Sequence, residues 1–373
     1  FNTAAWNGRS KLPGKPLVQR LRSRHHGVHH HAATERSSKL QPTGVVLISE
    51  EDVKKHLTSA DAVRLVEEVF RFHGRRQVVM PAKITLNMPT ERAHNWMNAM
   101  PGYLPELGVA GIKWAGGFVR NAELGLPYVM GTVILNSPLT GEVQAIISAG
   151  ALTTIRTGAA AAVAVRYLAH PDSKAVAFIG AGAQCRSSLR AIACLPEFSF
   201  STVRVYDRLP EASRQFVAEL AEVYKAEYVV CHSPQEAVTG ADVVVVATTA
   251  NEPLVAREWV HDTACVVKLG SYQELDDKLT LGAGRLVVDD WGQSLHRGEL
   301  VHLLERGAIS RDNVYGELGD IVAGRLPKGF SEGGPNVACL LGMATQDLAV
   351  GLHVYRQVLA AGQAQTFDFK VRG

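Results

Sequence analysis

The spacing of apolar residues predicts the first elements of the chain. The run VVLI, which starts at Val45, is typical of a short strand, and in 60–74 the apolar residues recur at helical spacing. Ser49 and Asp52 form a pair that can cap a helix start, and Gly74 is the predicted helix stop. We therefore expect a strand and then an amphipathic helix that ends at Gly74.

Between 79 and 150 the pattern changes to short β-like runs separated by turn-forming segments such as SPLTG. Strands are predicted at 82–88, 110–116, 128–136 and 143–149. The following segment, 152–169, is typical of an alanine-rich helix whose small side chains would let another element approach closely. We interpret this first region as α+β.

From about residue 174 predicted strands and helices alternate, which is typical of a parallel sheet with helices on both faces. After GGPN (333–336) a long helical pattern extends to Gly362 and is expected to pack on the first region. The predicted fold class is α/β, with a Rossmann-type doubly wound parallel sheet beside an α+β domain. The predicted domains are 1–43 (a basic extension), 44–165 with 341–373 (α+β), and 166–340 (Rossmann).

Charge separates residues 1–43 from the rest of the 373-residue chain. They hold eight Lys or Arg and one acidic residue, whereas the remainder has a net charge of −4. Because this extension lacks apolar periodicity, we expect it to be disordered. It could be an organelle leader, an expression tag or a mistranslated stretch. We expect a cytoplasmic protein, or a mitochondrial or other organellar one if the extension is a native leader.

Composition argues against two classes of partner. The mildly acidic body is unlike a nucleic-acid-binding surface. The longest apolar runs, such as 242–250, are far shorter than the roughly 20 residues that span a bilayer. The five cysteines are scattered, and neither they nor the histidines of 1–43 form a convincing ligand pattern. Buried thiols in a reducing compartment and no metal site are therefore expected.

A glycine pair marks the predicted cofactor loop. Gly180 and Gly182 follow the run VAFI, where a strand meets a helix, so backbone N–H groups could face a pyrophosphate. The third glycine of the usual fingerprint is Cys185 here. The next strand ends at Asp207, where a carboxylate would bind both ribose hydroxyls and repel a 2′-phosphate. NAD is the predicted cofactor, and the adjacent Arg208 leaves NADP open.

Three cations stand in apolar or small-residue surroundings, namely Lys83, Lys113 and Arg156. A lysine in a strand can simply extend its ammonium group to solvent. If the three converge, they form a carboxylate-binding pocket in which Arg156 can bond bidentately. A desolvated lysine near other cations has a lowered pKa and can exchange protons near neutral pH. Beside a nicotinamide, this cluster predicts hydride chemistry next to a carboxylate, with amino, imino or keto acids as substrates.

Several segments resemble a known family. The resemblance is carried, in chain order, by NAMPGYLP, GIKWAGGF, ILNSPLTGE, LTTIRTGAAAA, IGAGAQ, VYD, LVVDD, GELGDIV and LGMATQD. On these motifs the chain resembles the ornithine cyclodeaminase/mu-crystallin family over about 45–362. In the segments VVMPAKI, GIKW and VVDDW, the sequence is most similar to that of the siderophore-pathway amino-acid dehydrogenases, which form one branch of the family.

The resemblance implies a homodimer whose protomer joins a substrate and dimerisation domain to a Rossmann domain, with the active site between them. It implies that Lys113 is the active-site lysine and that Arg156 binds the substrate carboxylate. Lys83 stands where many members have arginine, and Asn98 is a further candidate substrate contact. The candidate cofactor contacts are Thr157, Gly180, Gly182, Ala183, Gln184, Asp207, Arg208, Thr248, Leu269 and Ser271.

Two departures from the cyclodeaminase pattern bear on the reaction. Cyclodeaminases carry an acidic residue at the position of Asn98, and an aspartate in the loop that here contains Ser271 and Tyr272. That aspartate is expected to handle the amine during ring closure, and this chain lacks it. The acidic residues that follow are Glu274, Asp276 and Asp277. They could partly substitute for the missing aspartate, but we expect them to begin a helix.

We therefore expect an NAD(P)-dependent reductase or dehydrogenase that acts at the α-carbon of an amino or imino acid. The substrate would be a ketimine, a cyclic imino acid or an opine-type adduct. One alternative is an ornithine or lysine cyclodeaminase, which is a lyase that uses NAD without net redox change. A second is a binding protein of the mu-crystallin type that holds a cofactor or a small ligand.

Overall fold

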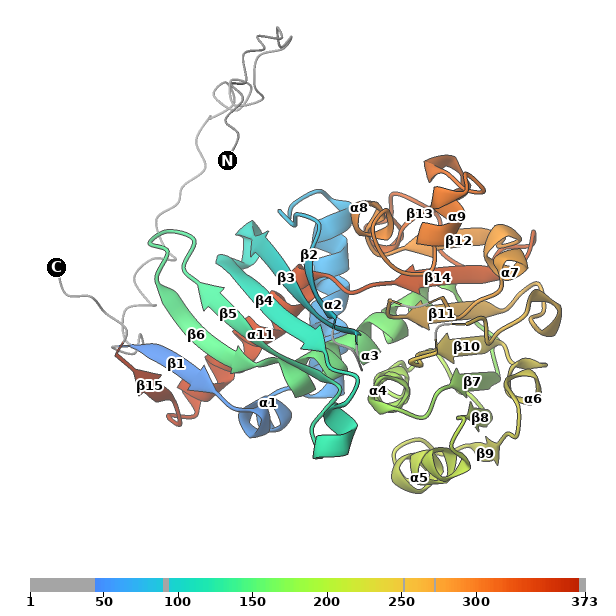
Figure 1. The fold of residues 1–373 in the computed structure, drawn as a ribbon, viewed down its shortest axis with the longest axis horizontal. Coiled ribbons are helices and arrows are strands. Elements are labelled where there is room, and N and C mark those ends of the chain that lie inside the picture. The colour runs from blue at the N-terminus through green and yellow to red at the C-terminus, as the bar shows by residue number, and fades with distance from the viewer. Residues whose placement is uncertain (1–43, 90–93, 251, 272, 369–373) are drawn as a thin grey trace, which may run out of the picture. The chain divides into compact units, whose positions relative to one another are not determined.

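The computed structural model describes residues 44–89, 94–250, 252–271 and 273–368. Within these ranges the chain forms two sheets joined by helices (Figure 1). The extension 1–43, which we expected to be disordered, lies outside the described residues.

The first sheet, sheet A, contains seven strands in the order β15-β1-β6-β5-β4-β3-β2. β1 pairs in parallel with β6, and the other neighbours are antiparallel. The strands are β1 (Val45–Ile48), β2 (Ile84–Pro89), β3 (His94–Leu104), β4 (Val109–Gly117), β5 (Val129–Asn136), β6 (Val143–Ser148) and β15 (Gln365–Phe367). β3 was not among the predicted strands, because Pro101 lacks the N–H of a central strand. Pro101 nevertheless lies opposite Ile112 of β4.

Three helices pack against sheet A, namely α1 (Glu50–His56), α3 (Ala149–Leu168) and α11 (Ala344–Ala360), and α2 (Ser59–Gly74) packs on α3 and α11. Ser49 and Asp52 form the predicted capping box at the start of α1. α11 contacts β3, β4 and β5, so the prediction that the last long helix packs on the first region is confirmed. In Figure 1 this helix passes behind the strands of sheet A.

Gly74 ends α2 as predicted, but its main effect is on packing. A Cβ at this position would lie 1.9 Å from the carbonyl oxygen of Gly319, so α2 can approach that segment only with a glycine here. The left-handed turn after the helix falls on Arg76, with φ 60°.

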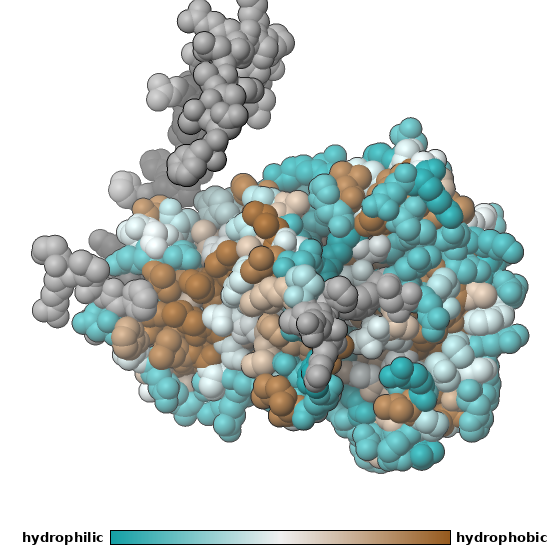
Figure 2. Space-filling view, viewed as in Figure 1, coloured by the Kyte–Doolittle hydropathy of each residue, from teal (hydrophilic) through white to brown (hydrophobic). Residues whose placement is uncertain are grey.

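The face of sheet A away from the helices carries large apolar side chains. Ile84 is 72% exposed and Met130 is 42% exposed, and the strand register places Ile84, Ala99 and Trp114 in one row on this face. Figure 2 shows apolar residues gathered over these strands. An uncovered apolar surface of this kind is typical of an interaction site.

The second sheet, sheet B, contains eight parallel strands in the order β13-β12-β14-β11-β10-β7-β8-β9. They are β7 (Ala175–Ile179), β8 (Thr202–Tyr206), β9 (Glu227–Val230), β10 (Val243–Val246), β11 (Cys265–Leu269), β12 (Arg285–Val288), β13 (Gly316–Glu317) and β14 (Asn336–Leu340). The helices of this half are α4 (Ala183–Ile192), α5 (Pro210–Leu220), α6 (Pro234–Val238), α7 (Asp277–Leu281), α8 (Trp291–Ser294), α9 (Val301–Glu305) and α10 (Leu318–Val322). The predicted Rossmann-type α/β class is confirmed.

β14 was missed, although it lies inside sheet B between β11 and β12. All five of its residues are buried, so the strand shows no alternation. A short apolar run of this kind cannot be told from a buried helix segment by its periodicity.

α3 packs closely on α4. A Cβ at Gly158 would lie 2.4 Å from Ser187 Oγ, so the predicted close approach at the small-residue helix is confirmed. In the part of the chain that the structure describes, no helix is long and apolar enough to span a bilayer.

Candidate functional site

Two of the three predicted cations meet at one carboxylate. Lys113 projects from β4 toward the helices, because the alternation of the strand turns Lys113 and Ala115 inward and Trp114 outward. Its Nζ donates a hydrogen bond to Asp347 Oδ1 at 3.0 Å. Arg156, on α3, donates from Nε to the same oxygen at 2.9 Å. Two elements that are distant in sequence, β4 and α3, therefore converge on Asp347 of α11.

This cluster is removed from water. Lys113 is 3% exposed, Arg156 5% and Asp347 0%. Burial is the main reason why the pKa of Lys113 falls to about 7; Asp347 opposes the fall, whereas Arg156 and Lys83 add to it. Burial alone would raise the pKa of Asp347, but Arg156 and Lys113 hold it below its usual range. The result is an ionised carboxylate beside a lysine that can gain or lose a proton near neutral pH.

The third cation, Lys83, lies just before β2 and reaches the segment that joins β14 to α11. Its Nζ donates to the carbonyl oxygen of Leu341 at 3.2 Å. Desolvation is the main reason why the pKa of Lys83 falls to about 8, and Arg297 and Arg156 lower it further. Buried Asp289 accepts hydrogen bonds from the backbone N–H groups of Leu341 and Gly342 at 2.8 and 2.6 Å. The backbone at Leu341 is thus bound by Lys83 at its carbonyl oxygen and by Asp289 at its N–H group.

Gly342 lies directly against the guanidinium group of Arg156. Its φ is +83°, and a Cβ there would be 2.5 Å from Arg156 Nη1. A glycine is therefore required for the chain to cross Arg156 on its way into α11.

Asn98 lies on β3, two residues from Met100, which pairs with Lys113 on β4. Its Oδ1 accepts a hydrogen bond from Thr85 Oγ1 at 2.8 Å and another from Arg297 Nη1 at 3.3 Å. The guanidinium group of Arg297 also lies 4.2 Å from the ring centroid of Trp96. The structure thus brings a fourth cation to the site.

Sequence reasoning missed Asp347, Asp289 and Arg297. Asp347, like Lys113, is a charged residue among apolar ones. The sequence analysis considered only lysine and arginine in such surroundings, so it did not select this aspartate. Asp289 is the first acid after the buried strand VV of β12. Arg297 stands among polar residues between α8 and α9, so nothing in its neighbourhood distinguishes it.

The predicted cofactor loop has the geometry of a dinucleotide turn. Gly180 has φ +99°, and a Cβ there would lie 2.6 Å from the carbonyl oxygen of Ala247. Gly182 is the N-cap of α4, and a Cβ there would meet nothing within 4 Å. Asp207 follows β8, and its Oδ2 accepts a hydrogen bond from the Ala181 N–H at 2.8 Å. The turn thus leaves open space at a helix start, with a carboxylate beside it.

The comparison with known proteins agrees with this geometry. The family model of the ornithine cyclodeaminase/mu-crystallin family matches residues 45–362. The chain belongs to this family.

Relatives within the family include several dehydrogenases and reductases. An alanine dehydrogenase of Archaeoglobus fulgidus is 32% identical over 87% of this chain and 98% of its own length. A Thermococcus litoralis Δ1-pyrroline-2-carboxylate reductase, solved with NADH and L-proline, superposes with a TM-score of 0.81 at 27% identity, covering 87% of this chain and 100% of the other. The iminosuccinate reductase of Paracoccus denitrificans, solved with NAD+, gives a TM-score of 0.76 at 29% identity, covering 86% and 98%. The finer likeness to the siderophore-pathway branch stays a prediction.

The loop residues of this family member fit a dinucleotide. Gly182 and Ala183 present the open start of α4, and the buried Gln184 Oε1 has no hydrogen-bond partner among the described residues. The exposed Arg208 follows Asp207 at the loop edge. Thr157 is half-buried on α3, the helix that packs on α4.

Thr248 is held by a buried charged network at the carboxyl ends of β10 and β11. Both its N–H and its Oγ1 donate to Glu274 Oε1 at 2.7 Å. Lys268 Nζ lies 3.5 Å from Glu274 Oε2 and 3.7 Å from Glu299 Oε2, and it donates to the Gly270 carbonyl oxygen at 3.0 Å. The network therefore orders the backbone between Leu269, which is buried, and Ser271, which is half-buried.

The acidic residues after Ser271 are engaged elsewhere. Asp276 caps α7 with a hydrogen bond to the Leu279 N–H at 2.7 Å, so the expectation that these acids begin a helix holds for Asp276 and Asp277. Glu274 instead lies fully buried before the helix, in the network with Thr248. Tyr272 lies outside the described residues.

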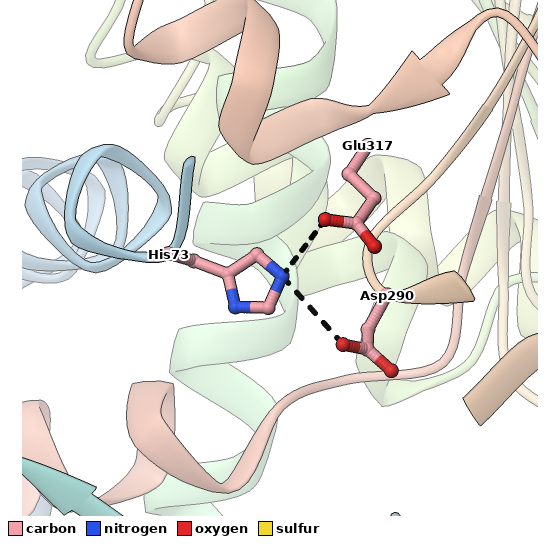
Figure 3. A group of neighbouring side chains, drawn as sticks. All are labelled: His73, Asp290 and Glu317. Atoms are coloured by element: carbon pink, nitrogen blue, oxygen red, sulfur yellow. Dashed lines mark ion pairs between the residues drawn. The ribbon is translucent and has the colours of Figure 1, made fainter. Parts of the chain in front are cut away.

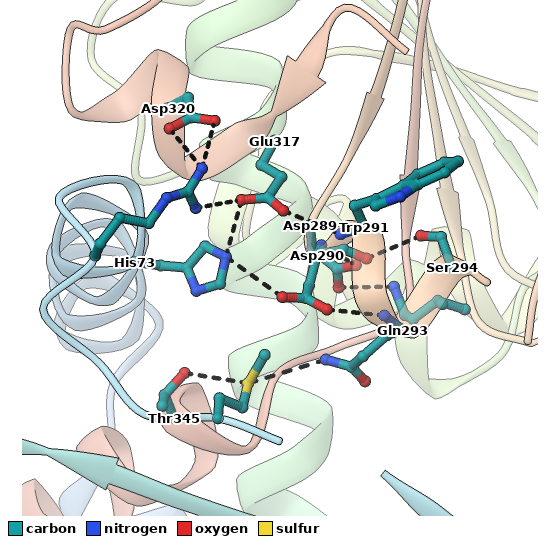
Figure 4. Close-up of polar contacts among 12 residues, drawn as sticks. His73, Asp289, Asp290, Trp291, Gln293, Ser294, Glu317, Asp320 and Thr345 are labelled. Carbon is teal, nitrogen blue, oxygen red and sulfur yellow. Dashed lines mark hydrogen bonds and ion pairs between the residues drawn. The ribbon is translucent and has the colours of Figure 1, made fainter. Parts of the chain in front are cut away.

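A separate ionic cluster joins α2 to the segments after β12 and at β13. His73 Nε2 lies 3.2 Å from Glu317 Oε2 and 3.6 Å from Asp290 Oδ2 (Figure 3). Ligand atoms of these three residues fall within 4.8 Å of one another, close enough for one metal ion. The Arg76 guanidinium, however, already pairs with Glu317 at 2.5 Å and Asp320 at 3.2 Å. Figure 4 shows this as a continuous polar network, so we interpret it as an ionic clamp between elements.

Proposed function

We propose that this protein is an NAD(H)-dependent reductase or dehydrogenase that acts at the α-carbon of an amino or imino acid. In the reductive direction a C=N bond, NADH and a proton give a CH–NH group and NAD+. The observation that carries the proposal is the buried Lys113 with a pKa of about 7, held 3.0 Å from Asp347 and close to Arg156.

Arg156 and Lys83 would bind the substrate carboxylate. Both carry positive charge at the segment 341–342, and Arg156 offers the planar fork that suits a carboxylate. Asn98 lies on the same face of sheet A as Lys113, because its partner Ala115 and Lys113 alternate on β4. It is available to contact the remainder of the substrate.

Lys113 would exchange the proton. As an ammonium group it can protonate the substrate nitrogen during reduction, and as an amine it can accept that proton during oxidation. Asp347 fixes the position of Nζ and keeps part of the lysine population charged. Its second oxygen, Oδ2, is buried and has no hydrogen-bond partner among the described residues, so it could accept the N–H of an iminium group.

NAD(H) would supply or accept the hydride at the α-carbon. Gly180, Gly182, Ala183 and Gln184 would hold the pyrophosphate, and Asp207 would bind the ribose hydroxyls. Leu269, Ser271 and Thr248 would border the nicotinamide half, and Thr157 lies on the adjoining helix α3. This assignment corresponds to a Rossmann domain at 166–340 and a substrate and dimerisation domain at 44–165 with 341–373.

The acids near Ser271 support a reductase over a cyclodeaminase. Asp276 is used as a helix cap and Asp277 is paired with His302 and Arg306. Glu274 is fully buried against Lys268 and Thr248. Within the described loop no carboxylate is left to handle a substrate amine.

A homodimer is the assembly that we propose. The archaeal alanine dehydrogenase, 32% identical to this chain, is described as a dimer with bound NAD. The apolar open face of sheet A, with Ile84, Leu86 and Trp114, would supply the contact surface. All five cysteines are free, which suits a reducing compartment such as the cytoplasm.

A screen of NADH oxidation tests the proposal. Pyruvate, 2-oxoglutarate and oxaloacetate, each with ammonium or methylamine, and cyclic ketimines serve as substrates. Lys113→Met should abolish turnover while leaving NADH binding, followed by fluorescence, nearly unchanged. No turnover by the wild type with any substrate would contradict a reductase and favour the binding protein. Ammonia and proline from ornithine with NAD would instead show the cyclodeaminase.

A further inference from the structure

We propose that His73, Asp290 and Glu317 form a binding site for one divalent transition-metal ion, with Zn²⁺ as the best-suited ion. This inference does not depend on the proposed function, because none of the three residues belongs to the candidate active site. His73 lies on α2, Asp290 is the N-cap of α8, and Glu317 ends β13 at the edge of sheet B. Because the three residues are far apart in sequence, they form no local ligand spacing, and no metal site was expected from the sequence.

The ring nitrogens of His73 are buried without a hydrogen bond. His73 is 6% exposed, and neither Nδ1 nor Nε2 has a hydrogen-bond partner among the described residues. Nε2 nevertheless faces two carboxylate oxygens, 3.2 Å from Glu317 Oε2 and 3.6 Å from Asp290 Oδ2 (Figure 3). Buried polar atoms normally have a hydrogen-bond partner, so this nitrogen calls for an explanation. A metal ion between the imidazole and the two carboxylates would supply it.

The distances within the cluster suit such an ion. Zn²⁺ binds nitrogen and oxygen ligands at roughly 2.0–2.2 Å, which places neighbouring ligands of a tetrahedral ion roughly 3.3–3.6 Å apart. The distances of 3.2 and 3.6 Å from His73 Nε2 are close to this range, and all three ligand atoms lie within 4.8 Å of one another. An imidazole with two carboxylates favours Zn²⁺ over Mg²⁺ or Ca²⁺, which prefer oxygen ligands alone.

Both carboxylates are held in place through their other oxygen. Asp290 Oδ1 accepts a hydrogen bond from the Gln293 N–H at 2.8 Å, and Glu317 Oε1 accepts one from the Trp291 N–H at 3.1 Å (Figure 4). Such outer hydrogen bonds orient the ligands of metal sites. The side chain of Asp290 is 17% exposed, so an ion has access from solvent and water can complete its coordination.

Arg76 competes with the ion for Glu317. Its Nη1 pairs with Glu317 Oε2 at 2.5 Å, and its Nη2 lies 3.2 Å from Asp320 Oδ2. Because the side chain of Arg76 is 51% exposed, it can leave Glu317 and keep Asp320. If the cluster is only an ionic clamp, removal of Arg76 creates no metal affinity. If it is also a metal site, removal of Arg76 increases the affinity for the ion.

The binding test uses the full chain with His25, His26, His29, His30 and His31 replaced by asparagine, so that metal binding by these histidines cannot contribute. This background protein is freed of metal with a chelator, and Zn²⁺ is titrated against a chromophoric competitor. We expect one Zn²⁺ ion to bind per chain. Co²⁺ in its place should give the visible absorption of an ion with four or five ligands, which is stronger than that of aqueous Co²⁺.

Variants in this background locate the ion. His73→Gln should abolish the binding of Zn²⁺, and Glu317→Gln should weaken it at least tenfold. Arg76→Gln should tighten it at least threefold, because the competing guanidinium group is gone. His302 offers a matched control, since its Nε2 pairs with one carboxylate, Asp277, at 2.6 Å. His302→Gln should bind Zn²⁺ as the background protein does.

Three results would overturn the inference. The first is a background protein that binds no Zn²⁺, and the second is binding that survives both His73→Gln and Glu317→Gln. The third is an Arg76→Gln variant that binds Zn²⁺ no more tightly than the background. Circular dichroism checks the folding of each variant. If His73→Gln does not fold, the opposite effects expected for Glu317→Gln and Arg76→Gln decide the question.

Discussion

Lys113 Nζ lies 3.0 Å from Asp347 Oδ1, although 234 residues separate the two in sequence. Arg156 shares the same oxygen at 2.9 Å. The carboxylate therefore holds two cations that would otherwise repel each other in a buried position. This arrangement accounts for a lysine that stays partly charged despite its lack of exposure.

The pH dependence of imine reduction should report the protonation of Lys113. Reduction needs the ammonium form, so kcat/KM should fall as the pH rises through about 7, the pKa of Lys113. Oxidation needs the amine, so its rate should rise over the same range. Steady-state rates between pH 5.5 and pH 9.5 measure both the fall of the reductive rate and the rise of the oxidative rate. A reductive rate that stays constant across this range would contradict the role of Lys113.

Asp347→Asn should lower the pH at which kcat/KM for imine reduction begins to fall. Asp347 is the group that raises the pKa of Lys113, whereas Arg156 and Lys83 lower it, so removing the negative charge leaves only the lowering effects. The rate at pH 7 should fall at least tenfold and recover toward more acidic pH. Circular dichroism serves as the control for folding. A lower rate whose pH dependence is the same as in the wild type would mean that Asp347 has only a structural role.

Gly180→Ala and Gly182→Ala should separate the stability of the cofactor loop from its affinity. The first would place a Cβ 2.6 Å from the Ala247 carbonyl oxygen at a φ of +99° and should cost about 1–3 kcal/mol in the free energy of unfolding. The second meets nothing within 4 Å, so stability should be unchanged while the added methyl group weakens NADH binding about tenfold. Urea unfolding and fluorescence titration measure the two effects. The reverse pattern would show that the loop does not face the pyrophosphate.

Asp207→Ser should shift the cofactor preference toward NADPH. The substitution removes the carboxylate that would repel a 2′-phosphate, and the hydroxyl can still accept a hydrogen bond at the loop. The ratio of kcat/KM for NADPH over NADH should rise at least tenfold. Adding Arg208→Ala should reverse part of this gain, because the exposed guanidinium group would pair with the phosphate. A ratio that does not change would place the adenosine ribose elsewhere.

Glu317→Gln should flatten the acid side of the stability profile. Burial would raise the pKa of Glu317, but His73 and Arg76 hold it down at about 2. A lowered pKa contributes stability above the ordinary value of 4.5 that is lost as the pH falls toward 2, with a magnitude of about 3 kcal/mol. Urea unfolding at pH 7, 5, 4 and 3.5 should show the first part of this fall, and the loss of stability should be smaller in the variant than in the wild type. The exposed Glu222→Gln serves as the control and should behave as the wild type.

Much of the fold follows from local pattern. The short apolar runs of sheet B, the capping box at Ser49 and the glycine turn at Gly180 each depend on a few neighbouring residues, so a single sequence contains enough information to predict them. The strands that were missed lack such a signal. β3 contains Pro101, and β14 is buried on both faces and shows no alternation.

The candidate site likewise contains residues that local sequence predicts and residues that only the packing of distant elements reveals. The sequence by itself determined that Lys83, Lys113 and Arg156 are unusual, because each places a charge among apolar or small residues, where an unpaired charge is costly. Only the tertiary structure decided which groups meet them: Asp347 across 234 residues from Lys113, and Arg297 across 199 residues from Asn98. Such partners come from different elements, and their distance depends on how α11 and the α8–α9 segment pack against sheet A. Local patterns predict that a buried charge needs a partner, whereas packing determines which residue becomes that partner.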